Sequence, residues 1–265
     1  MSWNESRNLP EPKCVIVTGA TGGIGKATVK ILADAGYSVA SVDINEESGP
    51  EFNGFFSDRG NRVKFFKADV SNEKEVERVT KDIADEFGTV YGLVNNAGIS
   101  SSQFGKPVKT KDLVDTQLLD IFKVNVFGAF YFTKHVLKYM LIKKSGSIVN
   151  ISSIYAVLGS PDSSIYAASK GALLSMTSSD SLHYAEDNIR VNAILPGFIR
   201  TPMLEKLSVK KEVYSGLYDQ AISAIPMKRI GTPNDVASLI KFLISEESSY
   251  ITGARIIIDG GYTLK

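Results

Sequence analysis

Short apolar runs alternate with longer segments of helical periodicity along most of the chain. The first run, residues 14–18, is rich in β-branched residues and leads into glycines, which is typical of a strand that enters a turn. From residue 23 to residue 35 the apolar side chains fall on one side of a helix, and Gly36 follows as a helix-ending residue. Residues 38–43 form the next short apolar run. The chain therefore begins with a predicted strand, helix and strand.

The same alternation continues toward the C-terminus. Further strands are predicted at residues 63–68, 92–95, 147–151, 190–195 and 254–259. Further helices are predicted at residues 72–87, within 113–143, at 165–186 and at 234–245. Strands that are apolar on both faces and alternate with helices form parallel sheets covered on both sides. The sequence therefore predicts an α/β Rossmann fold, a single domain with a doubly wound parallel sheet of about seven strands and helices on both faces.

Two segments differ from this regular pattern. Residues 1–12 are polar and lack the apolar core of a signal peptide, so we expect a flexible lead-in to a catalytic domain at residues 13–265. Residues 198–225 mix apolar side chains with lysines between a strand end and a helix. Ligands in such folds bind beyond the carboxyl ends of the strands, so this segment predicts a substrate lid. A plain pair of surface helices is the alternative.

Charge and composition narrow the function classes. The 265 residues carry 30 basic and 29 acidic side chains, a net charge of +1, which argues against nucleic acid or an anionic membrane as a partner. No stretch approaches the ~20 apolar residues of a membrane span. The single cysteine, Cys14, and two histidines give no metal-binding cluster and no internal disulfide. A reducing cytoplasmic location is therefore expected.

A glycine-rich turn, TGATGGIG at residues 18–25, joins the first strand to the first helix. Its glycines allow a sharp turn and a close approach of phosphates, which the helix N-terminus attracts. Gly19, Gly23 and Gly25 give the spacing G-x-x-x-G-x-G, which differs from the common G-x-G-x-x-G fingerprint. We expect this turn, including Thr21 and Ile24, to bind a dinucleotide.

Asp43 ends the second predicted strand. A carboxylate at this position can accept hydrogen bonds from both hydroxyls of an adenosine ribose, and it would repel a 2′-phosphate. No arginine follows it, since the next residues are Ile44 and Asn45. The sequence therefore favours NAD over NADP.

A tyrosine and a lysine lie four residues apart, and hence on one helix face, at Tyr166 and Lys170. An unperturbed tyrosine titrates near pH ~10, and a nearby ammonium favours its phenolate, so the lysine is a chemically sensible partner for a tyrosine base. Ser153 lies thirteen residues before Tyr166, just beyond a predicted strand. The tyrosine and lysine pair is chemically suited to acid–base chemistry.

Taken in order, the glycine turn, NNAG at residues 95–98, Asn125, Ser153, the YxxxK pair and Pro196-Gly197 resemble the short-chain dehydrogenase/reductase family. The resemblance covers the chain from about residue 13 to residue 262. It lies closest to the branch of oxoacyl-carrier-protein reductases and sugar or polyol dehydrogenases. It also implies a homo-oligomer, with a homotetramer as the usual form.

The resemblance implies a role for each matched residue. Tyr166 would be the general acid/base, and Ser153 would hydrogen-bond the substrate oxygen. Lys170 would lower the proton affinity of Tyr166 and hold the nicotinamide ribose. Asn125 would position a water, with a purely structural bond to neighbouring backbone as the alternative. The other cofactor contacts that the resemblance implies are Asp69 and Val70 near adenine, Thr201 at the carboxamide, and Asn95, Ala97, Gly98, Pro196, Gly197 and Ile199 along the cleft.

The leading hypothesis is an NAD-dependent enzyme that interconverts a secondary alcohol and its carbonyl. One alternative is an NADPH-dependent 3-oxoacyl-acyl-carrier-protein reductase, against which Asp43 argues. Another is a dinucleotide-sensing protein without catalysis, against which the complete Ser153, Tyr166 and Lys170 set argues. The substrate and the physiological direction cannot be inferred from the sequence.

Overall fold

A seven-stranded parallel sheet in the order β3-β2-β1-β4-β5-β6-β7 forms the centre of the computed structural model, which describes residues 13–46, 48–56, 62–101, 109–160, 163–204 and 219–264. The strands are β1 (Cys14–Thr18), β2 (Ser38–Asp43), β3 (Val63–Lys67), β4 (Gly92–Asn95), β5 (Gly146–Ile151), β6 (Ile189–Pro196) and β7 (Arg255–Ile258). The predicted doubly wound sheet is confirmed.

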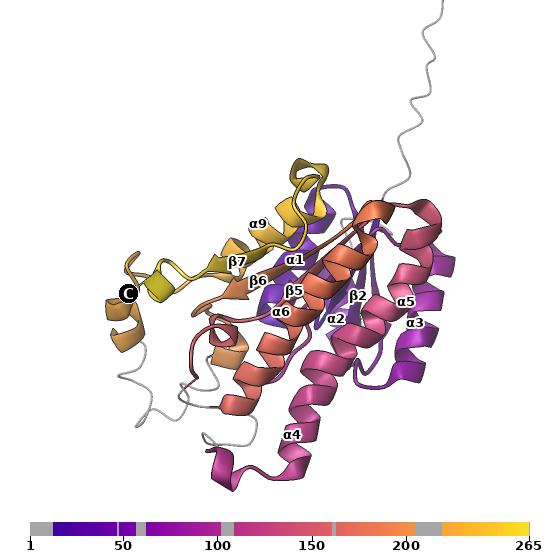
Figure 1. Ribbon diagram of the computed structural model, residues 1–265. Coiled ribbons are helices and arrows are strands. Elements are labelled where there is room, and N and C mark those ends of the chain that lie inside the picture. Colours follow the sequence, from indigo (N-terminus) through magenta and orange to yellow (C-terminus); the bar gives the residue numbers. More distant parts are fainter. Residues whose placement is uncertain are drawn as a thin grey trace, which may run out of the picture.

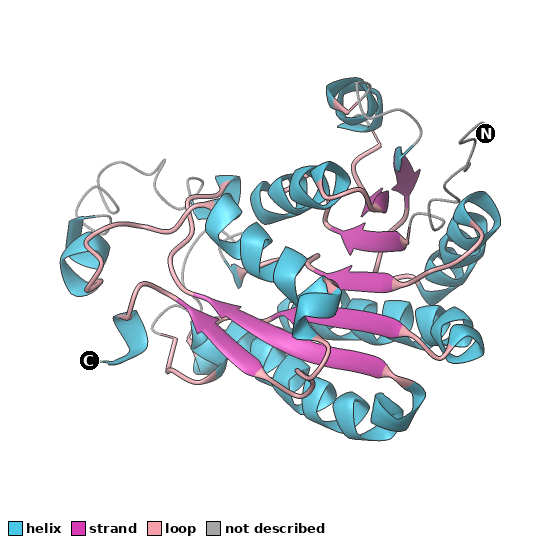
Figure 2. Cartoon of the chain, turned by 90° about the horizontal axis from the view of Figure 1, so that it is seen from above, coloured by secondary structure: helices cyan, strands magenta, loops and turns pink. Residues whose placement is uncertain are grey.

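Helices cover both faces of the sheet (Figures 1 and 2). One face carries α1 (Gly23–Asp34), α2 (Ser48–Phe55) and α9 (Pro233–Ile244). The other carries α3 (Glu73–Phe87), α5 (Gly128–Lys143) and α6 (Ser164–Tyr184). Along β1, Val15 and Val17 pack toward the first face, while Cys14 and Ile16 pack toward the second. This alternation explains why the strands are apolar on both sides.

Every strand and helix predicted from the apolar pattern begins and ends within two residues of an observed boundary, except inside residues 113–143. There the structure has α4 (Asp115–Phe122), a π-helical turn (Lys123–Phe127) and then α5. The apolar pattern does not predict α2, whose sequence contains Gly49, Pro50 and Gly54. The ring of Phe52 packs against that of Phe65 in β3, with ring centroids 6.4 Å apart, so tertiary packing supports this helix.

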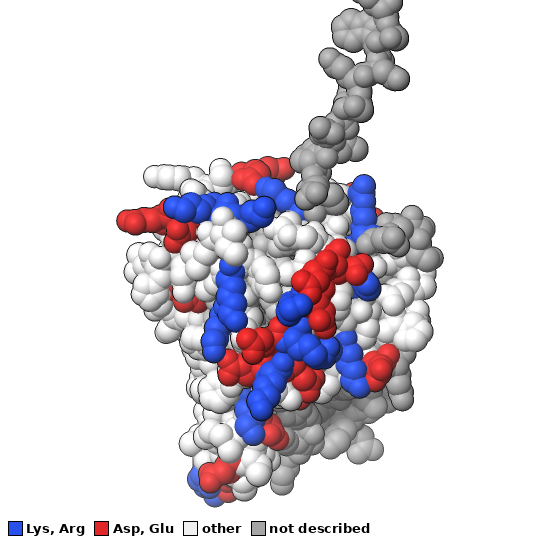
Figure 3. Space-filling view, turned by 90° about the vertical axis from the view of Figure 1, so that its right-hand side faces the viewer, with Lys and Arg blue, Asp and Glu red and all other residues white. Residues whose placement is uncertain are grey.

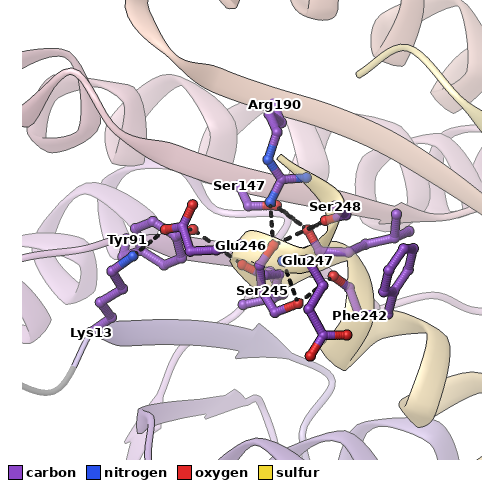
Figure 4. Close-up of polar contacts among 11 residues, drawn as sticks. Lys13, Tyr91, Ser147, Arg190, Phe242, Ser245, Glu246, Glu247 and Ser248 are labelled. Carbon is purple, nitrogen blue, oxygen red and sulfur yellow. Dashed lines mark hydrogen bonds and ion pairs between the residues drawn. The ribbon is translucent and has the colours of Figure 1, made fainter. Parts of the chain in front are cut away.

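The C-terminal end of α9 is tied to the amino ends of the strands (Figure 4). The buried Arg190 guanidinium donates to the carbonyl oxygens of Leu243 at 2.7 Å and Ser245 at 3.1 Å. A cation that binds these last carbonyls also complements the negative end of the helix dipole. Beside it, Glu246 accepts hydrogen bonds from Lys13 and Tyr91. These bonds fix α9 at the end of the sheet away from the carboxyl edge.

Charged side chains of both signs alternate on the face formed by α3 and α5 (Figure 3). Lys134 pairs with Glu73 at 2.6 Å, and Lys138 pairs with Glu77 at 3.3 Å. This face therefore presents neighbouring pairs of opposite charge, in keeping with the near-zero net charge of the chain.

Two predicted segments fall partly or wholly outside the described residues. The lead-in at residues 1–12 lies outside them, and so does the central part of the expected lid, residues 205–218. Both stay predictions. Within the described ranges, none of the helices combines the length and the apolar character that a membrane crossing requires.

Candidate active site

A cleft with a volume of about 730 Å³ opens at the carboxyl edge of the sheet, where the strand order reverses between β1 and β4. Crevices at this position are where open α/β sheets bind ligands. The sequence-predicted residues that line it are Gly19, Thr21, Gly23, Ile24, Asp43, Asp69, Val70, Ala97, Gly98, Ser153, Tyr166, Lys170, Pro196, Gly197, Ile199 and Thr201. One cleft thus brings together residues from the first strand to the turn after β6.

The glycine-rich turn has a backbone that side chains would obstruct. Gly19 has a φ of +62°, and a Cβ atom there would lie 2.9 Å from the Ala97 Cα atom. A Cβ atom on Gly25 would lie 2.1 Å from the Gly19 carbonyl oxygen, so Gly25 closes the turn and is outside the described cleft lining. Gly22 is the N-cap of α1 and has no side chain to bind the first amides. Bare backbone and a helix N-terminus at the cleft fit a pyrophosphate group.

Asp43 reaches the cleft from the end of β2 and is held by the glycine-rich turn. Its Oδ2 atom accepts hydrogen bonds from the Thr21 amide at 3.0 Å and the Thr21 hydroxyl at 2.8 Å. Its Oδ1 atom accepts one from the Asn45 amide at 3.2 Å. The exposed Ile44 lies beside it on the rim. The arrangement places a carboxylate with fixed partners at the cleft, next to the glycine-rich turn.

Asp69 lies in the turn between β3 and α3. Its Oδ1 atom accepts hydrogen bonds from the Ser71 amide at 2.9 Å and the Ser71 hydroxyl at 2.7 Å. These bonds stabilise the turn, and the residue also lines the cleft.

Ser153, Tyr166 and Lys170 converge at the other end of the cleft. Ser153 follows β5, and its side chain shares a hydrogen bond with the Tyr166 phenol. Tyr166 lies in the first turn of α6, where its amide donates to the N-cap hydroxyl of Ser163 at 3.2 Å. One turn later, the Lys170 Nζ atom lies 5.9 Å from the centroid of the Tyr166 ring.

Burial changes the pKa values of both titratable groups. It raises the pKa of Tyr166, and the hydrogen bond from Ser153 partly offsets this increase. Burial lowers the pKa of Lys170 to about 8. The Lys170 Nζ atom donates one hydrogen bond to the Ile151 carbonyl at 2.9 Å. The hydrogen bond of Ser153 favours the phenolate. The expected effect of Lys170 on the pKa of Tyr166 stays a prediction.

Ser152 and Ser153 have different partners. The Ser152 hydroxyl donates to the Lys170 carbonyl at 2.7 Å, so it fixes α6 to the end of β5. The Ser153 hydroxyl accepts from the Tyr155 amide at 3.2 Å and keeps contact with Tyr166. Ser153 is therefore the serine that can contact a substrate oxygen next to the phenol.

Asn125 lies in the π-helical turn and joins three parts of the site. Its Oδ1 atom accepts from the Ile99 amide at 2.8 Å, and its Nδ2 atom donates to the Ile99 carbonyl at 3.0 Å and to Ser169 at 3.0 Å. The structural bonds to backbone that the sequence left as an alternative are present. The side chain lies behind the described lining of the cleft.

Asn95 does not line the described part of the cleft, contrary to expectation. It is the last residue of β4, and its side chain is buried between the sheet and α5. There its Nδ2 atom donates to Thr133 of α5 and to Asn150 of β5. The residue that lines the cleft is Asn96, whose Nδ2 atom donates to the carbonyls of Thr18 and Gly19. The duplicated asparagine could have indicated this, because successive residues at a strand end face opposite sides.

Thr201 follows β6 and lines the cleft next to the glycine-rich turn. A Cβ atom on Gly23 would lie 2.9 Å from the Thr201 Cγ2 atom, so the absence of a side chain at Gly23 allows this close contact. Gly197 likewise allows Asp259 to pack against the turn after β6, because a Cβ atom there would lie 2.7 Å from that of Asp259.

The described residues contain no group of three or more His, Cys, Asp or Glu that could hold a metal ion.

Comparison with known proteins gives matches over nearly the whole chain. Residues 19–263 match the family model described as enoyl-(acyl carrier protein) reductase. The chain is 38% identical over 254 residues to the 3-oxoacyl-acyl-carrier-protein reductase FabG of Thermotoga maritima, an alignment that covers 96% of this chain and 99% of that protein. It is 36% identical over 255 residues to 2-(R)-hydroxypropyl-CoM dehydrogenase of Xanthobacter autotrophicus, with 95% and 98% covered.

The fold is shared with solved structures. The structure of ElxO with NADP bound is similar with a TM-score of 0.88 and 33% sequence identity. The alignment covers 96% of this chain and 100% of that chain.

Proposed function

Because the chain belongs to the short-chain dehydrogenase/reductase family, and is therefore an oxidoreductase of CH–OH groups that uses NAD or NADP, we propose that it is an NAD-dependent enzyme interconverting a secondary alcohol and its ketone. The observation that carries this proposal is the shared cleft, with a glycine-rich turn and Asp43 at one end and Ser153, Tyr166 and Lys170 at the other. When bound, the nicotinamide supplies the hydride acceptor or donor.

The residues around the reacting oxygen would move and stabilise the proton. Tyr166 takes the hydroxyl proton during oxidation and returns it during reduction. Ser153 donates a hydrogen bond to the substrate oxygen and stabilises the charge that develops there. Lys170 would contact the nicotinamide ribose, and Asn125 holds the surrounding backbone in place. The wall of the cleft would hold the rest of the cofactor through Asp69, Val70, Ala97, Gly98, Pro196, Gly197, Ile199 and Thr201.

The test of the acid–base role is Tyr166→Phe. This variant keeps the ring and removes the proton donor, so turnover should fall by at least about 10³-fold. Cofactor binding, followed by the fluorescence of the reduced nicotinamide, should change less than about threefold. Tyr184→Phe, on the same helix but packed in the core, is the control and should keep full turnover. Near-normal turnover by Tyr166→Phe would refute the assigned base.

Asp43 supports the preference for NAD. Its fixed carboxylate can accept both ribose hydroxyls and repels a 2′-phosphate. NADH should therefore bind at least about tenfold more tightly than NADPH, a difference of about 1.4 kcal/mol. Asp43→Ala should remove most of this difference by weakening NADH binding and strengthening NADPH binding. Equal affinities in the wild type would contradict the proposal.

A second candidate is an NADPH-dependent 3-oxoacyl-acyl-carrier-protein reductase, which the Thermotoga maritima relative favours. The described lining near Ser153 offers hydroxyl and apolar groups, among them Ser101, Tyr155, Phe198 and Met203. A panel of polyols, sugars and hydroxyacyl thioesters with both cofactors separates the two candidates. Turnover of acyl thioesters with NADPH but not with NADH would identify the reductase. Cofactor binding without turnover of any of these compounds would indicate a dinucleotide sensor.

We further propose a cytoplasmic homotetramer. Two surfaces expose large apolar side chains and would form its two kinds of contact. The first lies on α4 and α5, with Val114, Leu118, Leu119, Phe127, Phe130 and Ile142; we call it the helix surface. The second surrounds β7, with Met227, Tyr250, Ile257 and Leu264; we call it the strand surface. A tetramer of D2 symmetry requires two different self-complementary surfaces.

A further inference from the structure

Ser169 is a fully buried serine on α6, one residue before Lys170. Its hydroxyl accepts a hydrogen bond from the Asn125 Nδ2 atom at 3.0 Å. The same hydroxyl donates to the Tyr166 carbonyl oxygen at 2.8 Å. One small side chain therefore connects the π-helical turn to the turn of α6 that carries both titratable groups of the site.

The bond to Ser169 adds to two bonds of Ile99 that fix which way the Asn125 amide points. Both protons of the Nδ2 atom are used, one on the Ile99 carbonyl and one on Ser169, while the Oδ1 atom accepts from the Ile99 amide. An amide that exchanged its oxygen and nitrogen would lose both bonds to Ile99, and it could accept from Ser169 only by taking the hydroxyl proton from the Tyr166 carbonyl. The Oδ1 atom is held in one direction.

That direction matters for Lys170. A Cβ atom on Gly98 would lie 3.2 Å from the Lys170 Nζ atom and 3.4 Å from the Asn125 Oδ1 atom, so both polar atoms border the same space beside Gly98. The negative end of an amide dipole near an ammonium favours the charged form of the lysine. An Asn125 amide that turned its N–H groups toward Lys170 would have the opposite effect.

Resting on the function proposed above, we propose that Ser169 is a positioning residue that, together with the Ile99 backbone, holds the Asn125 amide and thereby affects the electrostatic surroundings of Lys170. It touches neither the substrate nor the cofactor in this role. Its hydroxyl acts through the amide of Asn125, while its bond to the Tyr166 carbonyl keeps the hydroxyl oxygen turned toward that amide.

Ser169→Ala is the principal test. It should lower kcat by about tenfold and leave the dissociation constant of NADH within twofold. The part of the kcat–pH profile that reflects the titration of Lys170 should move to lower pH by at least half a pH unit. Ser181→Ala is the matched control, because the buried Ser181 hydroxyl makes the same kind of bond, to the Ser178 carbonyl at 2.9 Å, on the same helix. It should keep the wild-type pH profile.

A double variant tests the connection to Asn125. If Ser169 acts through that amide, Asn125→Ala with Ser169→Ala should be no slower than Asn125→Ala alone. The proposal would be overturned if the loss of kcat in the double variant equalled the product of the losses in the two single variants. So would a Ser169→Ala protein with an unchanged pH profile, or one whose profile moves no further than that of Ser181→Ala.

A second measurement separates this proposal from the proposed function. The titration of the Lys170 13Cε signal, assigned with Lys170→Met, needs neither substrate nor turnover. A lower titration midpoint in Ser169→Ala supports the positioning role even if no alcohol or ketone is turned over, and an unchanged midpoint overturns it. Ser169→Cys, which keeps the size and a weak donor, should give a smaller shift in the same direction and serves if Ser169→Ala does not fold.

Discussion

At the residue scale, the contact between Ser153 and Tyr166 determines how the proposed reaction depends on pH. Burial raises the pKa of Tyr166 and the Ser153 hydrogen bond lowers it, so the phenol is protonated at neutral pH. A protonated phenol is ready to donate during carbonyl reduction. Alcohol oxidation needs the phenolate, so its rate should rise with pH by up to about tenfold per unit below the pKa.

Ser153→Ala tests this balance. Without the hydrogen bond the pKa of Tyr166 rises, so the ascending limb of the oxidation rate should move to higher pH. The measurement is kcat for oxidation between pH 6 and pH 10. Ser152→Ala is the control, because that hydroxyl binds the Lys170 carbonyl, and its limb should stay in place. A limb that moves to lower pH in Ser153→Ala would contradict the assignment.

Spacing predicted that Tyr166 and Lys170 share a helix face, because four residues on a helix are local geometry. The place of Ser153 beside them was implied by the family resemblance. Spacing could not predict the partners of Asn125, since those depend on a π-helical turn that brings it between Ile99 and Ser169. Asn95 was misplaced for a similar reason. The side on which a strand-end residue faces depends on the strand register, which no short motif contains.

At the element scale, the attachment of α9 gives a prediction about stability. Arg190 is buried and donates to carbonyls at the end of that helix, remote from the cleft. Arg190→Met should lower the free energy of unfolding by about 2–4 kcal/mol, because charged hydrogen bonds are lost and carbonyls are left without a donor. Urea denaturation measures this loss.

Arg229→Met is the control for that measurement. Arg229 pairs with Asp235 at the other end of α9, at 2.8 Å, but in an exposed position. Exposed pairs contribute little, so its effect should be much smaller. Equal losses in the two variants would show that the carbonyl contacts of Arg190 do not anchor the helix.

The elements themselves were predictable to different degrees. The strands and long helices follow from the apolar period, which burial on both faces of the sheet imposes. The helix α2 was not predicted because Gly49, Pro50 and Gly54 weaken its intrinsic propensity, and the packing of Phe52 against Phe65 of β3 supports it instead. A contact between two elements of this kind leaves no period in the sequence.

At the scale of the whole molecule, the two exposed apolar surfaces predict the assembly. The wild type should behave as a tetramer in size-exclusion chromatography with light scattering. Phe130→Asp on the helix surface and Ile257→Asp on the strand surface should each give dimers, because a charge in an apolar contact is costly. The double variant should be monomeric. Ile44→Asp, at the rim of the cleft, should leave the tetramer intact, and a monomeric wild type would contradict the proposal.

The cleft crosses the point where the strand order reverses, and this separates the residues proposed to select the dinucleotide from those proposed to transfer the proton. Asp43 and Thr21 belong to one half of the sheet, whereas Ser153 and Tyr166 belong to the other, and the hydrogen bonds within each group stay within its own half. Altering which dinucleotide is accepted should therefore leave the proton chemistry intact. Two properties that an enzyme must combine can in this architecture be inherited, exchanged or redesigned one at a time.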